Sequence, residues 1–223
     1  MNERTIWLIG QEGFLRLQDS LVVVAGLGGV GGHCAEALAR AGIGALHLID
    51  FDRVQASNLN RQLVATKSTI GQKKTEAMQA RLWEVSDCRV SLCDCRIDEQ
   101  TVAAAVPADA NYIVDAIDQL SGKLALAALA KERGIPIISC MGAGNRRDAS
   151  RFYVTDIYQT AGDPLARRMR QALRKMGIEE LDGVYSDEER HLPENHGSGS
   201  LAPVTAAAGL VAAAHVIARL SSL

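Results

Sequence analysis

The stretch LVVVAGLGGVGGHCAEALARA, residues 21–41, decides the fold. Leu21–Ala25 is a short apolar run rich in valine, glycines follow it at once, and Cys34–Ala41 carries Ala and Leu at helical spacing. This order predicts a strand, a tight turn and a helix. The turn itself, 26–31, matches the pattern GxGxxG.

The alternation of apolar runs and helical patterns continues along the chain. We expect further strands at 45–49, 90–93, 112–116, 135–139 and 152–156, and helices at 72–84, 99–106, 123–133, 164–176 and 201–220. Strands that alternate with helices form right-handed βαβ units around a parallel sheet. The predicted fold class is therefore α/β: a Rossmann-like, mostly parallel twisted sheet with helices on both faces, plus antiparallel strand(s) and a C-terminal helix.

The chain has 223 residues, a length that suits one domain. Changes in the residue pattern along the chain predict its organisation. We expect an N-terminal arm at 1–19, a nucleotide-binding core at 20–144, and an extension for substrate and dimer contacts at 145–223. The polar stretch 178–200 contains Gly and Pro and is predicted to be a mobile loop.

Composition excludes several classes of protein. With 48% hydrophobic and 22% charged residues, the chain has the composition of a folded domain, which excludes disorder throughout. The net charge of −2 excludes a wholly basic nucleic-acid coat. Charged residues interrupt the first 20 residues, so we expect no signal peptide and a cytoplasmic location. Apolar runs such as 201–214 are shorter than the roughly 20 residues that cross a bilayer, so we expect no membrane span.

The five cysteines form no CxxC pair, which disfavours a disulfide framework and a zinc ribbon. Cys93 and Cys95 lie two apart on a predicted strand, with Cys88 nearby, but core packing is favoured over a metal site. Cys140, at the end of the fifth strand, is the cysteine closest to the expected crevice. A buried strand thiol is favoured there over a nucleophile.

The glycine turn predicts a nucleotide site, because it lies between a strand and a helix and is followed 19 residues later by Asp50. Glycines let the backbone approach a phosphate, and an acid after the second strand can accept hydrogen bonds from ribose. Both NAD-dependent oxidoreductases and ATP-dependent adenylating enzymes use this turn.

Polar residues after the turn favour ATP, which requires cations along the triphosphate and a carboxylate for Mg²⁺. Asp52, Asn58, Arg61 and Lys74 follow Asp50, and DAID (115–118) ends a strand at the edge where ligands of such sheets bind. Each of these residues, taken alone, could instead have a structural role. Lys74 could lie on the solvated face of a helix, and Asp118 could be a helix N-cap.

The chain resembles the ThiF/MoeB/HesA superfamily, the bacterial relatives of ubiquitin-activating enzymes. The motifs that carry the resemblance are GLGGVGG (26–32), LIDFDRVQASNLNRQ (48–62), IGQKKTEAM (70–78) and DAID (115–118). It implies the cofactors ATP and Mg²⁺ and adenylation of a carboxylate, in which pyrophosphate leaves and an acyl-adenylate remains.

The resemblance also implies roles for single residues. Asp50 would hold the ribose, the turn would hold the phosphates, and Asp118 would be the metal ligand. The implied cofactor-binding residues are Gly26, Gly28, Gly29, Gly31, Asp50, Asp52, Asn58, Arg61 and Lys74. The implied catalytic residues are Arg61, Lys74, Asp118 and Arg4. Arg4 would act across a homodimer as an arginine finger on the partner subunit's site; its alternative is a surface arginine near a frayed end.

Later motifs are similar to those of the tRNA threonylcarbamoyladenosine dehydratases: GAG (142–144), VTDI (154–157), DPLARRMRQALRK (163–175) and VYS (184–186). This implies activation of the threonylcarbamoyl carboxylate on tRNA, then cyclising dehydration. The alternative is adenylation of the C-terminal Gly-Gly of a ubiquitin-like sulfur-carrier protein. Eight basic residues against three acidic ones between 146 and 175 favour RNA as the partner. An oxidoreductase and a non-catalytic nucleotide sensor are less favoured.

Overall fold

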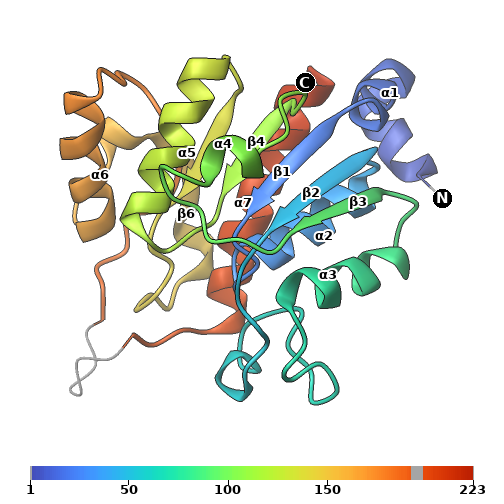
Figure 1. The fold of residues 1–223 in the computed structure, drawn as a ribbon, viewed down its shortest axis with the longest axis horizontal. Helices are drawn as coiled ribbons and strands as arrows, with labels where there is room; N and C mark the ends of the chain where they lie inside the picture. Colours follow the sequence, from blue (N-terminus) through green and yellow to red (C-terminus); the bar gives the residue numbers. More distant parts are fainter. Residues whose placement is uncertain (1, 192–197, 223) are drawn as a thin grey trace.

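The computed structural model describes residues 2–191 and 198–222. It contains one seven-stranded sheet with the order β3-β2-β1-β4-β5-β7-β6 (Figure 1). All neighbouring strands are parallel except β6 and β7, which are antiparallel. The strands are β1 Leu21–Ala25, β2 Ala45–Ile49, β3 Arg89–Cys93, β4 Tyr112–Asp115, β5 Ile137–Cys140, β6 Phe152–Asp156 and β7 Asp182–Ser186. The fold class predicted from the sequence is confirmed.

Helices cover both faces of the sheet (Figure 1). They are α1 Glu3–Gln18, α2 Gly31–Ala41, α3 Lys74–Trp83, α4 Val102–Ala105, α5 Leu120–Arg133, α6 Pro164–Lys175 and α7 Ala202–Ser221. Three short 3₁₀ helices, η1 Ala56–Asn58, η2 Ala149–Arg151 and η3 Ile157–Gln159, lie in the connections.

The two core layers follow from the alternation of side chains along β1. Val22 and Val24 pack with residues of α2, α3 and α7, whereas Val23 and Ala25 pack with residues of α4 and α5. All four side chains are fully buried, so β1 is an interior strand covered on both faces of the sheet. The turn that follows it is therefore held by packing on both faces of the sheet.

The C-terminal helix α7 is apolar and long enough to cross a membrane, yet it contacts α2, α1 and the strands β5 to β7. Its Gly209 approaches the start of α2 so closely that an added Cβ would lie 2.3 Å from the carbonyl oxygen of Val30. Such packing is typical of a core helix, and it brings the first half of α7 to the glycine turn.

Two segments differ from the sequence predictions. The predicted mobile loop contains β7, which pairs with β5 and β6 and is the second strand from the β6 edge of the sheet; residues 192–197 of that loop lie outside the described residues. The segment predicted as an N-terminal arm forms α1, which is interrupted at Gly10 by a φ of 75° and buries Phe14 and Leu17. In both segments long-range contacts stabilise a structure whose local pattern is weak. The sheet also runs across residue 144, the predicted boundary between core and extension.

Candidate active site

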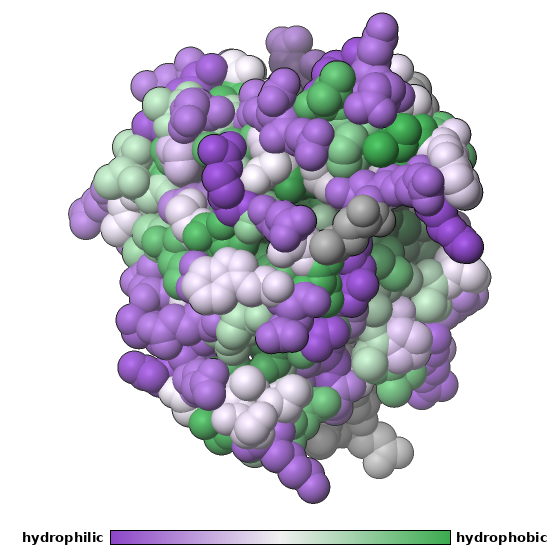
Figure 2. Space-filling model, turned by 90° about the vertical axis from the view of Figure 1, so that its right-hand side faces the viewer, coloured by the Kyte–Doolittle hydropathy of each residue, from purple (hydrophilic) through white to green (hydrophobic). Residues whose placement is uncertain are grey.

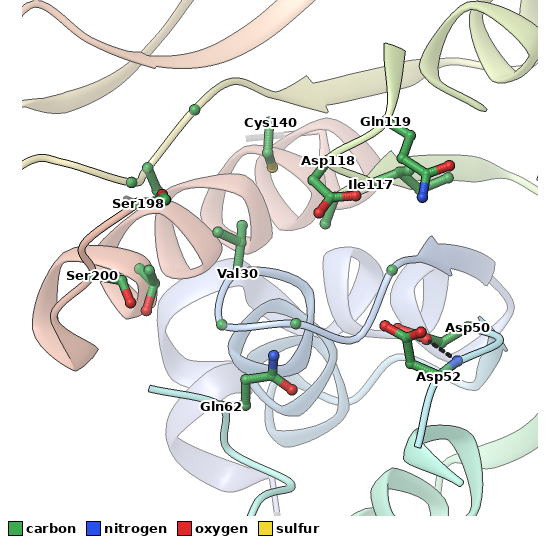
Figure 3. Close-up of a pocket in the computed structure, with 18 of the residues that line it drawn as sticks. Val30, Asp50, Asp52, Gln62, Ile117, Asp118, Gln119, Cys140, Ser198 and Ser200 are labelled. Carbon is green, nitrogen blue, oxygen red and sulfur yellow. Dashed lines mark hydrogen bonds between the residues drawn. The ribbon is translucent and has the colours of Figure 1, made fainter. Parts of the chain in front are cut away.

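A cavity of about 830 Å³ opens at the carboxyl ends of the parallel strands. It is bordered by the glycine turn after β1, the loops after β2, β4 and β5, and the first turns of α6 and α7. Figure 3 shows residues from these segments facing a common space. This is the edge at which ligands of open parallel sheets bind.

The glycines of the turn serve two different purposes. Gly26 has a φ of 89°, and a Cβ added to Gly31 would lie 1.8 Å from the Gly26 carbonyl oxygen, so these two glycines allow the turn to close. At Gly28 the nearest atom to an added Cβ is Gln62 Nε2, 3.9 Å away. The absence of a side chain at Gly28 therefore keeps part of the cavity open and is not required for packing in the protein interior. Gly26, Gly28 and Gly29 line the cavity, whereas Gly31 is not among its lining residues.

The backbone of the turn presents unused donors. The N–H groups of Gly28, Gly29 and Val30 make no hydrogen bond to any part of the chain within 2–191 and 198–222. They precede α2, whose N-terminus carries the positive end of the helix dipole. A phosphate group fits such a cradle.

An ion-paired group of three charged side chains borders the turn. Asp50 is buried, and its carboxylate accepts hydrogen bonds from the N–H of Leu27 at 2.7 Å and of Asp52 at 2.8 Å. Lys74 Nζ lies 2.8 Å from Asp52 Oδ2 and 3.8 Å from Asp50 Oδ2. Burial raises the pKa of Asp50, while Lys74 and the two N–H groups act in the opposite direction. Asp50 thereby fixes the turn to the loop after β2.

Asn58, Arg61 and Gln62 come from one loop and all line the cavity. Asn58 is buried at the end of η1, and its Oδ1 accepts a hydrogen bond from the N–H of Gln55 at 3.0 Å. Arg61 is half-buried and donates to the Ser57 carbonyl oxygen and to Asn60 Oδ1. Its guanidinium is thus held within its own loop at the edge of the cavity.

Gln62 is a site residue that the sequence analysis missed. It is buried, its Oε1 has no hydrogen-bond partner within the described part of the chain, and its side chain lies beneath the glycine turn (Figure 3). A buried, unpaired amide costs free energy unless a ligand satisfies it. Gln62 is the last letter of the quoted motif LIDFDRVQASNLNRQ, so the signal was present without an assigned role.

Asp118 is exposed and directs its carboxylate into the cavity (Figure 3). It makes no hydrogen bond or ion pair within residues 2–191 and 198–222. Below it, Asp115 is fully buried and ion-paired with Lys123, with 3.0 Å between Asp115 Oδ2 and Lys123 Nζ. Of the two acids in DAID, one is structural and one is available to a ligand.

The available carboxylate fits a magnesium ion. Mg²⁺ is usually held by one or two carboxylates together with substrate phosphates, rather than by a complete protein cage. In the described part of the chain no group of three metal-ligating side chains occurs, which also disfavours a cysteine metal site. Cys93 and Cys95 are free, with 3.1 Å between their sulfur atoms.

Cys140 lines the cavity but is buried, and burial raises the pKa of its thiol to about 12. Because a thiolate is the nucleophilic form, little of it exists at neutral pH. We expect Cys140→Ala to keep adenylation close to the wild-type rate and to lower the free energy of unfolding by about 1 kcal/mol. Pyrophosphate release measures the adenylation rate, and urea unfolding measures the free energy of unfolding. A loss of activity above a hundredfold in a folded variant would contradict this assignment.

Arg4 is the one predicted catalytic residue that lies far from the cavity. It is exposed on α1, which packs on the end of α7 distant from the glycine turn (Figure 1). The fold does not bring it to the site of its own chain. The remaining side chains that line the cavity, and that the sequence analysis did not assign to the site, include Gln119, Asp163, Arg168, Arg190, Ser198, Ser200 and Thr205.

Comparisons with known proteins agree with this geometry. A tRNA threonylcarbamoyladenosine dehydratase of Bacillus subtilis is 42% identical over 81% of this chain and 72% of the relative. The Escherichia coli enzyme of that name is 33% identical over 97% of this chain and 91% of the relative.

A crystal structure of the E. coli dehydratase TcdA in complex with ATP superposes with a TM-score of 0.94. The two are 35% identical, and the match covers 99% of this chain and 93% of the other. The family model described as the ThiF family matches residues 2–223. The resemblance read from the motifs is thereby confirmed, and the chain belongs to the ThiF family.

Proposed function

We propose that this protein is an ATP-dependent tRNA threonylcarbamoyladenosine dehydratase. The observation that carries the proposal is one cavity in which a glycine turn lies together with Lys74, Arg61 and Asp118; within the described residues, three N–H groups of the turn and the Asp118 carboxylate have no partner. Relatives that cover most of the chain bear this enzyme's name. The proposal includes tRNA as the partner and a cytoplasmic location.

Each group has a role that its position supports. The N–H groups of Gly28, Gly29 and Val30 bind phosphate oxygens of ATP, and Asp50 accepts a hydrogen bond from ribose. Arg61 and Lys74 lie where they can oppose the negative charge of the triphosphate, and Asn58 and Gln62 supply amide hydrogen bonds. Asp118 would hold Mg²⁺, which when bound neutralises charge on the phosphate oxygens.

The reaction balances in two steps. An oxygen of the threonylcarbamoyl carboxylate attacks the α-phosphorus of ATP, and the bond to pyrophosphate breaks. An atom of the carbamoyl group then attacks the activated carbonyl carbon, a proton is released, and AMP leaves with the former carboxylate oxygen. The substrate has lost one water molecule and has cyclised. No enzyme thiol is required, which agrees with the burial of Cys140.

The matched pair Gly28→Ala and Gly31→Ala tests the phosphate cradle. Gly28→Ala should leave the melting temperature unchanged and weaken ATP binding by about ten- to a hundredfold, because its methyl group would displace a phosphate oxygen from the N–H donors and a lost charge-assisted hydrogen bond costs about 1.5–3 kcal/mol. Gly31→Ala should destabilise the fold by about 3 kcal/mol, because its Cβ would meet a backbone oxygen. Calorimetry of ATP binding and thermal unfolding distinguish the two. Equal ATP affinity of Gly28→Ala and the wild type would contradict the cradle.

We further propose that the protein acts as a homodimer. Arg4, Trp7 and Leu8 lie three and four residues apart on α1 and so share one face of the helix. Trp7 is 72% exposed and Leu8 81% exposed. Large exposed apolar side chains are typical of interaction surfaces. Figure 2 shows the side of the molecule that carries α1 and α3, on which apolar residues line a hollow among polar ones. A dimer interface on this face of α1 would therefore include Arg4.

Hybrid dimers test whether Arg4 acts in trans. In a dimer of one Arg4→Ala and one Asp118→Asn subunit, one site keeps its own Asp118 and receives Arg4 from the other subunit. An exchanged equal mixture should therefore recover roughly a quarter of the wild-type activity, because half of the dimers are hybrids with one intact site each. Pyrophosphate release gives the activity, and mass spectrometry of differently tagged subunits gives the exchange. Complete exchange without recovery would remove this role.

The acceptor is tested by exchange of labelled pyrophosphate into ATP, which requires reversible adenylation. We expect exchange to depend on tRNA that carries threonylcarbamoyladenosine and not on the same tRNA without the modification. Exchange that depends instead on a ubiquitin-like protein ending in Gly-Gly would assign the chain to the sulfur-carrier adenylyltransferases.

A further inference from the structure

The eight basic residues between 146 and 175 fall into two groups. Four are bound within the protein: Arg146 to Asp163 at 3.2 Å, Arg151 to Asp187 at 2.7 Å, Arg170 to Thr160, and Arg174 over the ring of Tyr158 at 5.2 Å. The other four have no side-chain partner within 2–191 and 198–222: Arg147, Arg167, Arg168 and Lys175. Only the second group is available to bind another molecule.

Three of the four available cations lie on α6, and its packing determines their direction. Ala166, Met169 and Leu173 form its buried face, against residues of α5 and η3. At 100° per residue, Arg168 and Lys175 lie on the opposite face, with Gln171 between them. All three are exposed. Seven residues of helix separate the two cations by roughly 10 Å.

This row begins at the cavity. Arg168 lines it together with Asp163 and Pro164 at the start of α6, whereas Lys175 is the last residue of the helix. The glycine turn lies at the N-terminus of α2. Helix α6 lies near the other end of the sheet, beside α5 (Figure 1). The row is thus continuous with the part of the cavity that the nucleotide-binding turn does not occupy. Glu179 and Glu180 follow shortly after α6, so the positive surface ends there.

We propose that the Arg168–Lys175 row binds backbone phosphates of the tRNA strand that presents the modified nucleotide to the cavity. The proposal rests on the function proposed above. Free cations on a rigid helix at the mouth of a site bind phosphates without reading sequence. The row therefore positions the substrate; it does not take part in adenylation.

The test measures the binding of tRNA carrying threonylcarbamoyladenosine as a function of salt, with Arg168→Ala, Lys175→Ala and the double variant. The slope of log K against log salt is negative, and each lost phosphate contact reduces its magnitude by about 0.7–0.9, so the magnitude for the double variant should be roughly 1.4–1.8 smaller than for the wild type. Arg89→Ala is the matched control. Arg89 is exposed at the start of β3, at the sheet edge opposite the cavity, and has no side-chain partner in the described chain. Its slope should equal that of the wild type.

The outcomes separate this proposal from the proposed function. The double variant could show the same salt slope as Arg89→Ala while the wild-type protein dehydrates the tRNA. That result would refute phosphate binding by the row and would leave the proposed function intact. A wild type that binds tRNA through the row but never dehydrates it overturns the function alone. If the double variant binds a Gly-Gly carrier protein more weakly but binds tRNA normally, the row recognises an acidic protein and the proposal is wrong.

Discussion

Asp118→Asn is expected to lower ATP-dependent pyrophosphate release by about 10³-fold and to leave the melting temperature unchanged. Asparagine keeps the size of the side chain but removes the charge that would hold a magnesium ion against the triphosphate. Electrostatic groups directed at charge in the transition state contribute about 10²–10³-fold each. Because Asp118 makes no contact within the described chain that stabilises the fold, its loss should appear in the rate and not in stability.

Asp109→Asn provides the control for this measurement. Asp109 is exposed just before β4, whereas Asp118 follows the same strand at its other end. The same chemical change is thereby made on both sides of one strand. Equal pyrophosphate release by the two variants would remove Asp118 from the site.

Lys123→Met is expected to lower the free energy of unfolding by about 3–5 kcal/mol, the cost of leaving a buried charge without its partner. Lys123 is fully buried and donates to Asp115 Oδ2, to Ser139 Oγ and to the carbonyl oxygen of Cys140, the last at 2.7 Å. Asp115 in turn accepts from the N–H of Ile117 at 3.1 Å. The pair therefore joins the loop that carries Asp118 to the end of β5, beneath the cavity.

A double-mutant cycle separates the ion pair from simple packing. Asp115→Asn removes the buried charge and keeps an acceptor for Ile117, so Asp115→Asn with Lys123→Met should lose clearly less stability than the sum of the single changes. Urea unfolding of the four proteins measures the coupling. Strict additivity, or a single Lys123→Met loss below 1 kcal/mol, would contradict a structural ion pair.

The features predicted correctly from sequence are those encoded by neighbouring residues. The run 21–41 places a strand, a glycine turn and a helix within one βαβ unit, and Asp50 follows at the spacing that brings it to the turn. β1, the glycine turn and α2 could therefore be predicted from local pattern alone. β7 could not, because DGVYS has only two large apolar residues, and its pairing partners come from β5 and β6.

The part of the site that could not be predicted depends on burial and pairing. The number of basic residues does not show which of them are paired. Arg146 is buried against Asp163, whereas Arg168 lines the cavity. Likewise the letters DAID do not show that Asp115 is ion-paired with Lys123 below the cavity, whereas Asp118 has no partner among the described residues. Gln62 stands beside Arg61 in the motif, but only the fold shows that its Oε1 is buried under the turn without a hydrogen-bond partner in the described part of the chain. These are tertiary properties, set by elements far apart in the chain.

Mass spectrometry of tRNA nucleosides tests the central claim most directly. The wild-type protein is incubated with tRNA that carries threonylcarbamoyladenosine, with ATP and magnesium, and the tRNA is digested to nucleosides under conditions that preserve the cyclised product. We expect this nucleoside to lose the mass of one water molecule in an amount equal to the AMP formed, and to stay unchanged without ATP or with Asp118→Asn. An unchanged nucleoside beside ATP turnover by the wild-type protein would contradict the account.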